Sequence, residues 1–285
     1  MSIARQIPVP KARTLLDSTR LGARTLLDVR QDFEYEEGHL PGATLIPLPQ
    51  LAGRAGELDP LLPTVVYCRS GRRSLAGANL LAGLGFKEAM SIEGGILAWD
   101  GAQAVGPLDL GLAALLGAST PREILERAWG MEQVLEEYYT TLAGRAAVSE
   151  TTGAEVAELF LRLAGYEVRH RRMIAELWKR LAGQGGAKTE DVQAFEQRAR
   201  ASVAPGTLEG GLSAADYLGQ LGDPGSMAEA LDLSMAVEAQ ALDLYLRRAR
   251  DETDADLRRT LVLLAEEEKA HLKILGNFVD SRRSF

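Results

Sequence analysis

Two stretches in the C-terminal half of the chain share one pattern that predicts how this half folds: Leu163-Ala164-Gly165-Tyr166-Glu167-Val168-Arg169-His170 and Leu264-Ala265-Glu266-Glu267-Glu268-Lys269-Ala270-His271. In each stretch a glutamate precedes a histidine by three positions, so the two side chains share one face of a helix. The chain has three histidines, and two of them occupy these matching places. The pattern predicts a repeated helical unit that presents a carboxylate and an imidazole on one face.

A lone glutamate precedes each stretch, at a matched distance from a tyrosine. Glu132 lies seven residues before Tyr139, and Glu238 lies seven residues before Tyr245. The offset between the two lone glutamates is 106 residues, and the offset between the two histidines is 101 residues. This repeat predicts a duplicated helix hairpin, and therefore four long helices that pack as an antiparallel bundle.

Four carboxylates that face the inside of one bundle need compensation, because burying like charges is very costly, and two divalent cations would supply it. The candidate ligands are Glu132, Glu167, His170, Glu238, Glu268 and His271. Bridging carboxylates with one imidazole per metal suit iron or manganese, with zinc as a further alternative. Tyr139 and Tyr245 would pack near the site, either as outer-shell residues or simply as core. Glu137, Glu266 and Glu267 are interpreted either as further ligands or as solvated side chains.

Two lone glutamates and two Glu-x-x-His pairs on four facing helices form the site of ferritin-like di-iron bundles. Residues 120–280 resemble the rubrerythrin branch of this family, with the six candidate ligands at its motif positions. The resemblance implies two iron ions that use peroxide or dioxygen as oxidant, and a homodimer. The family's rubredoxin tail needs four cysteines, whereas this sequence has one, so we expect an external electron donor.

The only cysteine, Cys68, opens the segment Cys68-Arg69-Ser70-Gly71-Arg72-Arg73-Ser74, directly after an apolar run. A thiolate is a useful nucleophile only when its pKa is lowered. Three features would lower it here: the neighbouring arginines, the N-terminus of a following helix, and backbone N–H groups of a tight loop that form an anion-binding nest. Gly71 would let the chain curl closely around the sulfur. Such a loop could stabilise a thiolate or a persulfide anion.

Two alternatives for Cys68 fit the sequence less well. A buried structural cysteine is common, but it explains neither the arginines nor the position between a strand and a helix. A phosphatase loop would place an arginine six residues after the cysteine, where this chain has Ser74, and a histidine before it, where this chain has Tyr67.

The first hundred residues alternate short apolar runs with helical stretches, which predicts a doubly wound parallel sheet with ligand sites at the carboxyl ends of its strands. The expected strands are 25–29, 44–46, 63–67 and 89–92, and the expected helices are 11–19 and 72–84. Cys68 would therefore lie at the carboxyl end of a strand, where this class of fold places its chemistry.

Residues 11–100 resemble a single rhodanese domain. The matching segments are Leu27-Asp28-Val29-Arg30, Gly38-His39-Leu40-Pro41-Gly42-Ala43, the Cys68–Ser74 loop and Ile92-Glu93-Gly94-Gly95-Ile96-Leu97-Ala98-Trp99. The resemblance implies a sulfurtransferase in which Cys68 takes a sulfane sulfur from a donor such as thiosulfate and passes it to a thiol acceptor. The persulfide would be held by Arg69, Ser70, Gly71, Arg72, Arg73 and Ser74. Asp28, Arg30 and His39 are expected to support the site without taking part in the chemistry.

At 285 residues the chain is long enough for two domains. We expect an α/β domain over 1–104, a linker over 105–119 with a short apolar helix around 108–116, and an all-α four-helix bundle over 120–285. The long helices are expected from a Thr120–Glu123 capping box to about 143, from Thr151 or Thr152 to about 181, from Asp223-Pro224 to about 250, and from a Thr253/Asp256 cap to about 280, with a further helix at 189–202.

The charge distribution bears on the partners. Residues 1–104 hold equal numbers of basic and acidic residues, so the net charge of −8 lies in the helical half. This acidity argues against nucleic acid as a partner, because phosphate binding needs a basic face. No apolar run approaches the roughly 20 residues that span a bilayer, and no signal peptide is evident, so we expect a cytoplasmic protein and no membrane partner. A single cysteine agrees with a reducing compartment.

Two functional hypotheses follow. In the first, a sulfurtransferase is linked to a di-iron oxidoreductase of peroxidase type, and the covalent linkage suggests that the two centres are coupled. In the second, the protein is a sulfurtransferase whose helical half stores or senses metal, or mediates dimerisation, without redox turnover. Metal stoichiometry and peroxide-dependent spectra would separate the two hypotheses.

Overall fold

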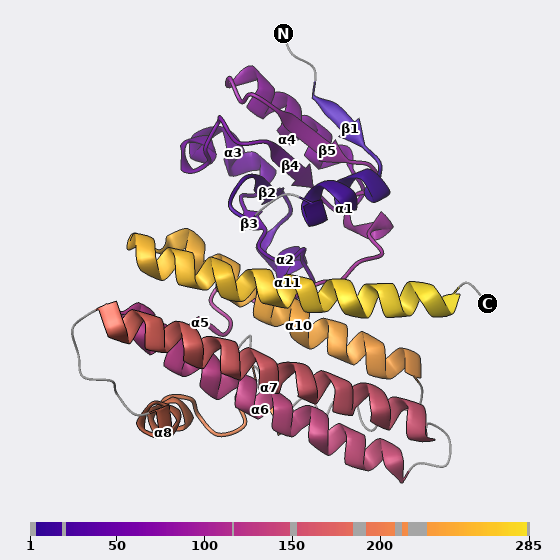
Figure 1. Ribbon diagram of the computed structural model, residues 1–285. Coiled ribbons are helices and arrows are strands. Elements are labelled where there is room, and N and C mark those ends of the chain that lie inside the picture. The colour runs from indigo at the N-terminus through magenta and orange to yellow at the C-terminus, as the bar shows by residue number, and fades with distance from the viewer. Residues whose placement is uncertain are drawn as a thin grey trace. The chain divides into compact units, whose positions relative to one another are not determined.

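The computed structural model describes residues 4–18, 21–115, 117–148, 153–184, 192–208, 213–215 and 227–283. The chain forms two compact units, Met1–Leu108 and Asp109–Phe285 (Figure 1). The boundary between them falls inside the segment 105–119 that we expected to be a linker.

The first unit is built on a parallel sheet of five strands in the order β1-β5-β4-β2-β3. The strands are β1 (Arg5–Ile7), β2 (Thr25–Asp28), β3 (Thr44–Leu45), β4 (Thr64–Tyr67) and β5 (Ala89–Ile92). Strand β4 lies in the middle of the sheet and is buried over its whole length, as expected for a strand covered on both faces. Because side chains alternate along a strand, Val65 and Tyr67 face one core while Val66 and Cys68 face the other.

Helices cover both faces of this sheet. Helices α3 (Leu48–Arg54) and α4 (Arg72–Gly83) contribute to the core that contains Val66, and α1 (Val9–Ser18) and α2 (Asp32–Glu37) contribute to the core that contains Val65. Two short 3-10 helices, η1 (Ala55–Glu57) and η2 (Gly95–Ala98), complete the unit. This is the doubly wound α/β fold that the alternating pattern predicted, confirmed by the strand order and the parallel pairing.

The second unit is helical. Its long helices are α6 (Pro121–Ala147), α7 (Gly153–Gln184), α10 (Met227–Asp251) and α11 (Ala255–Arg283). Helix α6 pairs with α7, and α10 pairs with α11, so the predicted pair of helix hairpins is present (Figure 1). Helix α8 (Val192–Ser202) packs on α6, and the short α5 (Leu112–Leu115) contacts α6 and α10. No helix in the described part of the chain combines the length and the apolarity that crossing a membrane requires.

The helix ends show where sequence signals were sufficient. The predicted capping box is confirmed: the Thr120 hydroxyl accepts a hydrogen bond from the Glu123 N–H, and the Glu123 carboxylate accepts one from the Thr120 N–H. The cap of α11 was assigned wrongly, because Asp254 and not Thr253 accepts the N–H groups of the first turn. The expected starts at Thr151 or Thr152 and at Asp223-Pro224 lie outside the described residues.

The sequence analysis missed one strand and two α-helices of the first unit. Strand β1 has only three residues, two of them exposed, so it has no apolar run. Helix α2 occupies a charged segment, and α3 begins after Pro47 in a segment too short for a helical period. These elements depend on tertiary packing, which decides short segments more strongly than local propensity.

Candidate active site and metal centre

Cys68 lies where strand β4 gives way to helix α4. The strand ends at Tyr67, and α4 begins at Arg72, with Gly71 as its N-cap residue at a φ of +89°. This left-handed conformation favours glycine. It turns the Gly71 N–H toward the sulfur, to which it donates a hydrogen bond of 3.1 Å. The side chain is 1% exposed, so the sulfur sits at the base of the loop.

Opposing effects act on the Cys68 thiol, and the net result is a lowered pKa. Burial raises the pKa, because it disfavours the thiolate. The hydroxyl of Ser74 and the backbone N–H groups of Ser74, Ser70 and Gly71 stabilise the thiolate and outweigh burial. The loop is therefore a nest of donors around an anionic sulfur.

A second turn supports the cysteine loop from behind. The carbonyl of Cys68 accepts a hydrogen bond from the Ile96 N–H at 2.8 Å, and the carbonyl of Arg69 accepts one from the Leu97 N–H at 3.1 Å. Gly95, at a φ of +60°, makes this approach possible, since a Cβ there would lie 2.2 Å from the Cys68 carbonyl oxygen. Apart from the pair of glycines, no direct signal for this contact is present in the sequence.

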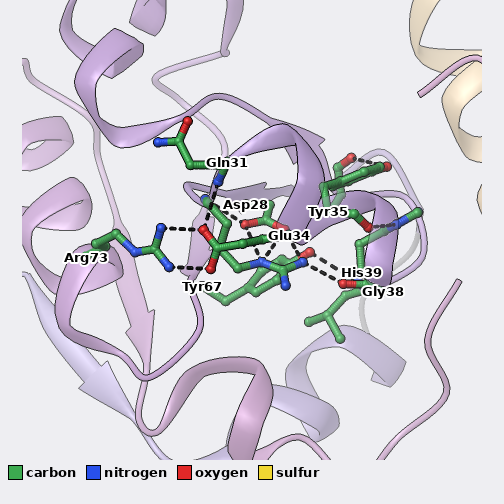
Figure 2. A network of polar contacts seen from close by, with 11 residues as sticks. Asp28, Gln31, Glu34, Tyr35, Gly38, His39, Tyr67 and Arg73 are labelled. Atoms are coloured by element: carbon green, nitrogen blue, oxygen red, sulfur yellow. Dashed lines mark hydrogen bonds and ion pairs between the residues drawn. The ribbon is translucent and has the colours of Figure 1, made fainter. Parts of the chain in front are cut away.

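The three arginines of the loop are in different situations. Arg73 forms two hydrogen bonds of 2.6 Å to the carboxylate of Glu34 on α2 (Figure 2). This contact with Arg73, with burial opposing it, lowers the pKa of Glu34 to about 2. Arg69 and Arg72 are exposed and form no ion pair within the described part of the chain. Sequence reasoning missed Glu34, because 39 residues separate it from Arg73.

The expected supporting residues lie beside this clamp. Arg30 and Asp28 form a buried ion pair of 2.7 Å, and Arg30 also donates to the Gly38 carbonyl at 2.6 Å. His39 contacts the Tyr35 carbonyl oxygen through Nδ1 at 2.9 Å, and its ring stacks on the Tyr35 ring (Figure 2). These contacts tie the strand ends to α2.

In the second unit the six candidate ligands come from four helices and lie together. Helix α6 supplies Glu132 and α10 supplies Glu238, while α7 and α11 each supply a Glu-x-x-His pair. All six side chains are buried, and the four carboxylates are at most 1% exposed. The ligand atoms form three overlapping groups within 4.8 Å, namely Glu167/His170/His271, Glu132/His170/Glu268 and Glu238/Glu268/His271.

Each histidine turns Nδ1 toward the carboxylates. Nδ1 of His170 lies 3.1 Å from Glu132, and Nδ1 of His271 lies 3.1 Å from Glu238. The two hairpins contribute to one cluster, since Nδ1 of His170 on the first hairpin is also 3.9 Å from Glu268 on the second. The two rings stack, with centroids 4.1 Å apart and an interplanar angle of 7°.

The donor set fits divalent metal ions. Both carboxylate oxygens of Glu167 are buried and make no hydrogen bond within the described residues. Burial, with the nearby charges of Glu132 and Glu238, raises the pKa of Glu167 well above its ordinary value. Burial acts in the same direction on Glu238, but the adjacent His271 lowers the pKa of Glu238 overall. Carboxylate oxygens and imidazole nitrogens at this spacing suit iron, manganese or zinc.

One of the predicted tyrosines contacts the cluster directly. The Tyr139 hydroxyl donates a hydrogen bond of 2.8 Å to Glu238, which belongs to the other hairpin. Burial, together with Glu238 and Glu167, raises the pKa of Tyr139 well above its usual value, so the phenol keeps its proton. Tyr245 is also fully buried.

The additional glutamates differ from one another. Glu137 accepts a hydrogen bond from Gln133 and belongs to none of the three groups. Glu266 is partly buried and also lies outside them. Glu267 is half-exposed, and its Oε2 lies 3.7 Å from Nε2 of His170.

Each of the two units matches a known protein family. Residues 11–102 match the rhodanese-like domain family, and residues 123–279, more than half of the chain, match the rubrerythrin family.

Individual relatives match the first unit. A putative sulfurtransferase, YtwF of Bacillus subtilis, is 40% identical over 76 residues, which are 27% of this chain and 73% of that protein. A sulfurtransferase of Allochromatium vinosum is 34% identical over 74 residues, covering 26% of this chain and 69% of that protein. Two further curated relatives, YrkF and YqhL of Bacillus subtilis, are matched over only 41% and 60% of their own length.

Among solved structures, a rhodanese-related protein from Thermoplasma volcanium is 30% identical, with a TM-score of 0.30, and the match covers 33% of this chain and 89% of that one. A rhodanese-like domain protein from Staphylococcus aureus is 26% identical, with a TM-score of 0.31, over 33% of this chain and 90% of that one. With Cys68 in the strand-to-helix loop and the six ligands on four helices, the chain belongs to the rubrerythrin family and carries a rhodanese-like domain before its helical bundle.

Proposed function

We propose that the protein is a sulfurtransferase that carries sulfane sulfur as a persulfide on Cys68, linked to a di-iron carboxylate centre with peroxidase-type activity. The observation that carries the sulfur-transfer part is the Cys68 sulfur, held at the carboxyl end of β4 by donors that lower its pKa. The comparisons support sulfur transfer in the first unit and a rubrerythrin domain in the second.

Sulfur transfer follows from this geometry in two steps. The Cys68 thiolate attacks the outer sulfur of a donor such as thiosulfate, a sulfur–sulfur bond forms on the enzyme, and sulfite leaves with the electron pair of the broken bond. The thiolate of an acceptor then attacks the outer sulfur of the persulfide, which returns Cys68 to its thiolate form. The N–H groups of Ser70, Gly71 and Ser74 that stabilise the thiolate would also hold the persulfide anion.

The exposed arginines of the loop indicate which class of sulfur donor the site would attract. Arg69 and Arg72 follow Cys68 closely in the sequence and form no ion pair within the described residues, whereas Arg73 is held by Glu34. An anionic donor would therefore be attracted by Arg69 and Arg72, while Arg73 keeps the loop in shape. Replacement of Arg69 and Arg72 together is expected to raise the KM for thiosulfate more than it lowers kcat.

The test of the sulfur-transfer part is a single-turnover reaction with thiosulfate. We expect sulfite release and a mass increase of one sulfur atom on the chain, both abolished by Cys68→Ser. Because Cys68 is the chain's only cysteine, the mass change needs no mapping. Sulfite release that persists in Cys68→Ser would refute the proposed nucleophile.

In the second unit, Glu132, Glu167 and His170 would hold one metal ion, and Glu238, Glu268 and His271 would hold the other. A bound iron pair supplies the two-electron reduction of peroxide, with an external donor replacing the electrons. The chain's own contribution is to bury the cluster, to orient each Nδ1 toward it, and to hold a proton on the Tyr139 hydroxyl beside Glu238.

The test of the metal part is the metal content after anaerobic reconstitution with Fe²⁺. We expect about two iron ions per chain, and their loss in the Glu132→Ala/Glu238→Ala variant. Iron that binds but gives no spectral response to peroxide would favour the storage or sensing alternative. A chain that binds no metal would refute the di-iron centre and leave Cys68 as the reactive group.

The physiological setting is part of the same proposal. A cytoplasmic location would keep Cys68 reduced. The resemblance to the rubrerythrin family favours a homodimer. The partners would be a sulfane-sulfur donor, a thiol acceptor and an external electron donor. The Cys68→Ser variant also tests coupling of the two centres, since unchanged turnover of the metal centre with sulfane-sulfur substrates would show that they act separately.

A further inference from the structure

The duplicated hairpins place different residues against the two histidines. The 101-residue offset that relates His170 to His271 also relates Tyr166 to Glu267. Both residues directly precede the glutamate of a Glu-x-x-His pair, and both lie against the histidine of the other hairpin. Glu267 Oε2 is 3.7 Å from Nε2 of His170, whereas the Tyr166 ring is centred 5.5 Å from the His271 ring.

Glu267 is placed to act on His170 from the outside. Nδ1 of His170 faces the carboxylate cluster, at 3.1 Å from Glu132, so Nε2 is the nitrogen that faces Glu267. A carboxylate near the Nε2–H favours the tautomer that leaves the Nδ1 lone pair available for a metal ion. It also adds negative charge close to the ion.

Tyr166 gives His271 a different environment. A phenol ring offers no anionic acceptor to an imidazole N–H. The guanidinium of Arg169 lies 4.3 Å from the centre of the same ring, which brings positive charge to this side of the cluster. The anionic partner on one side and the cationic neighbour on the other change metal binding in opposite directions.

We infer that the two metal positions are inequivalent, and that Glu267 is a positioning residue that makes the position of Glu132, Glu167 and His170 bind a divalent cation more tightly than the position of Glu238, Glu268 and His271. The inference rests on the proposed di-metal centre. Outer partners of a metal-bound histidine typically change metal affinity by about 10- to 100-fold, so the two positions differ by about tenfold or more.

The test is a calorimetric titration of the metal-free chain with Mn²⁺, with free Mn²⁺ counted by electron paramagnetic resonance. Wild-type protein is expected to bind two ions in two resolved steps. Glu267→Gln is expected to weaken the tighter step by about tenfold or more and to leave the weaker step unchanged. Glu158→Gln, which removes the same charge from an exposed site on α7, is the matched control and should change neither step.

A second variant tests for a gain of metal affinity. Tyr166→Glu places a carboxylate beside His271 and is expected to strengthen the weaker step. Two equal steps in the wild type, or an unchanged tighter step in Glu267→Gln, would overturn the inference while leaving the di-metal centre intact. Binding of fewer than two ions by the wild type would instead overturn the di-metal centre and the inference together.

Discussion

The ion pair between Glu34 and Arg73 should stabilise the first unit, and the structure sets the size of the effect. The pKa of Glu34 falls from 4.5 to about 2, mainly through its hydrogen bonds to Arg73, which at full strength corresponds to about 3 kcal/mol of unfolding free energy. Because the Arg73 side chain is 33% exposed, solvent screening reduces this to about 1 to 2 kcal/mol. Glu34→Gln should therefore increase the unfolded population of this unit by about 5- to 30-fold at pH 7.

The sign of the pH dependence follows from the lowered pKa. A carboxyl whose pKa is lowered on folding contributes its full stability above its unfolded pKa of 4.5, and loses it as the pH falls toward about 2. The difference between wild type and Glu34→Gln should thus be largest at pH 7 and should have mostly disappeared by about pH 2.

Hydrogen exchange measures this difference in the full chain. The amides of β4, in the middle of the sheet, should exchange only when the first unit unfolds, so their protection factors report its stability without interference from the bundle. Glu37→Gln, on the same helix but exposed, is the matched control and should leave protection unchanged. Equal protection of wild type and Glu34→Gln at pH 7 would refute the reasoning, as would a difference that grows on acidification.

Three further predictions concern single side chains. Ser74→Ala removes a donor from the Cys68 thiolate, so the pKa of Cys68 should rise and the acid limb of its alkylation rate should move to higher pH; an unmoved limb would contradict this. Gly95→Ala places a Cβ against the Cys68 carbonyl and should destabilise the first unit by more than about 1 kcal/mol in hydrogen exchange, whereas Gly83→Ala, which meets no atom within 4 Å, should not. Tyr139→Phe leaves Glu238 without its phenol donor and should lower the thermal stability of the metal-free bundle by about 1 kcal/mol, a result that an unchanged melting curve would contradict.

The sequence was most informative where a fixed spacing implies a shared face. A glutamate and a histidine three residues apart on a helix must lie on the same side, so both Glu-x-x-His pairs could be identified without knowledge of the helix packing. The same holds for two strands of the sheet, since the short segments rich in apolar residues that end at Asp28 and Tyr67 form β2 and β4, and β4 is buried over its whole length. In both cases the local period was enough to predict the element.

Contacts between distant segments carried no such signal. The partner of Arg73 is Glu34, 39 residues away on a helix of six residues, and nothing in the local pattern around either residue indicates the pair. The hydrogen bond from Tyr139 to Glu238 spans 99 residues. The repeat predicted that both residues would lie near the cluster, but not that a tyrosine of one hairpin would bond a glutamate of the other.

The crossed contacts of the bundle bear on how the centre forms. Tyr139 bonds Glu238 and His170 approaches Glu268, so the first hairpin supplies partners to carboxylates of the second. In the reverse direction, His271 shares a ligand group with Glu167. Two of the three ligand groups contain residues of both hairpins, whereas Glu238, Glu268 and His271 all belong to the second hairpin. The complete cluster of six ligands therefore forms only when the hairpins are docked, and a bound metal would in turn favour the docked state, since it screens four carboxylates that are buried together. Duplication of a hairpin thus explains why the ligands repeat, while the docking of unequal copies allows their surroundings, Glu267 on one side and Tyr166 on the other, to differ.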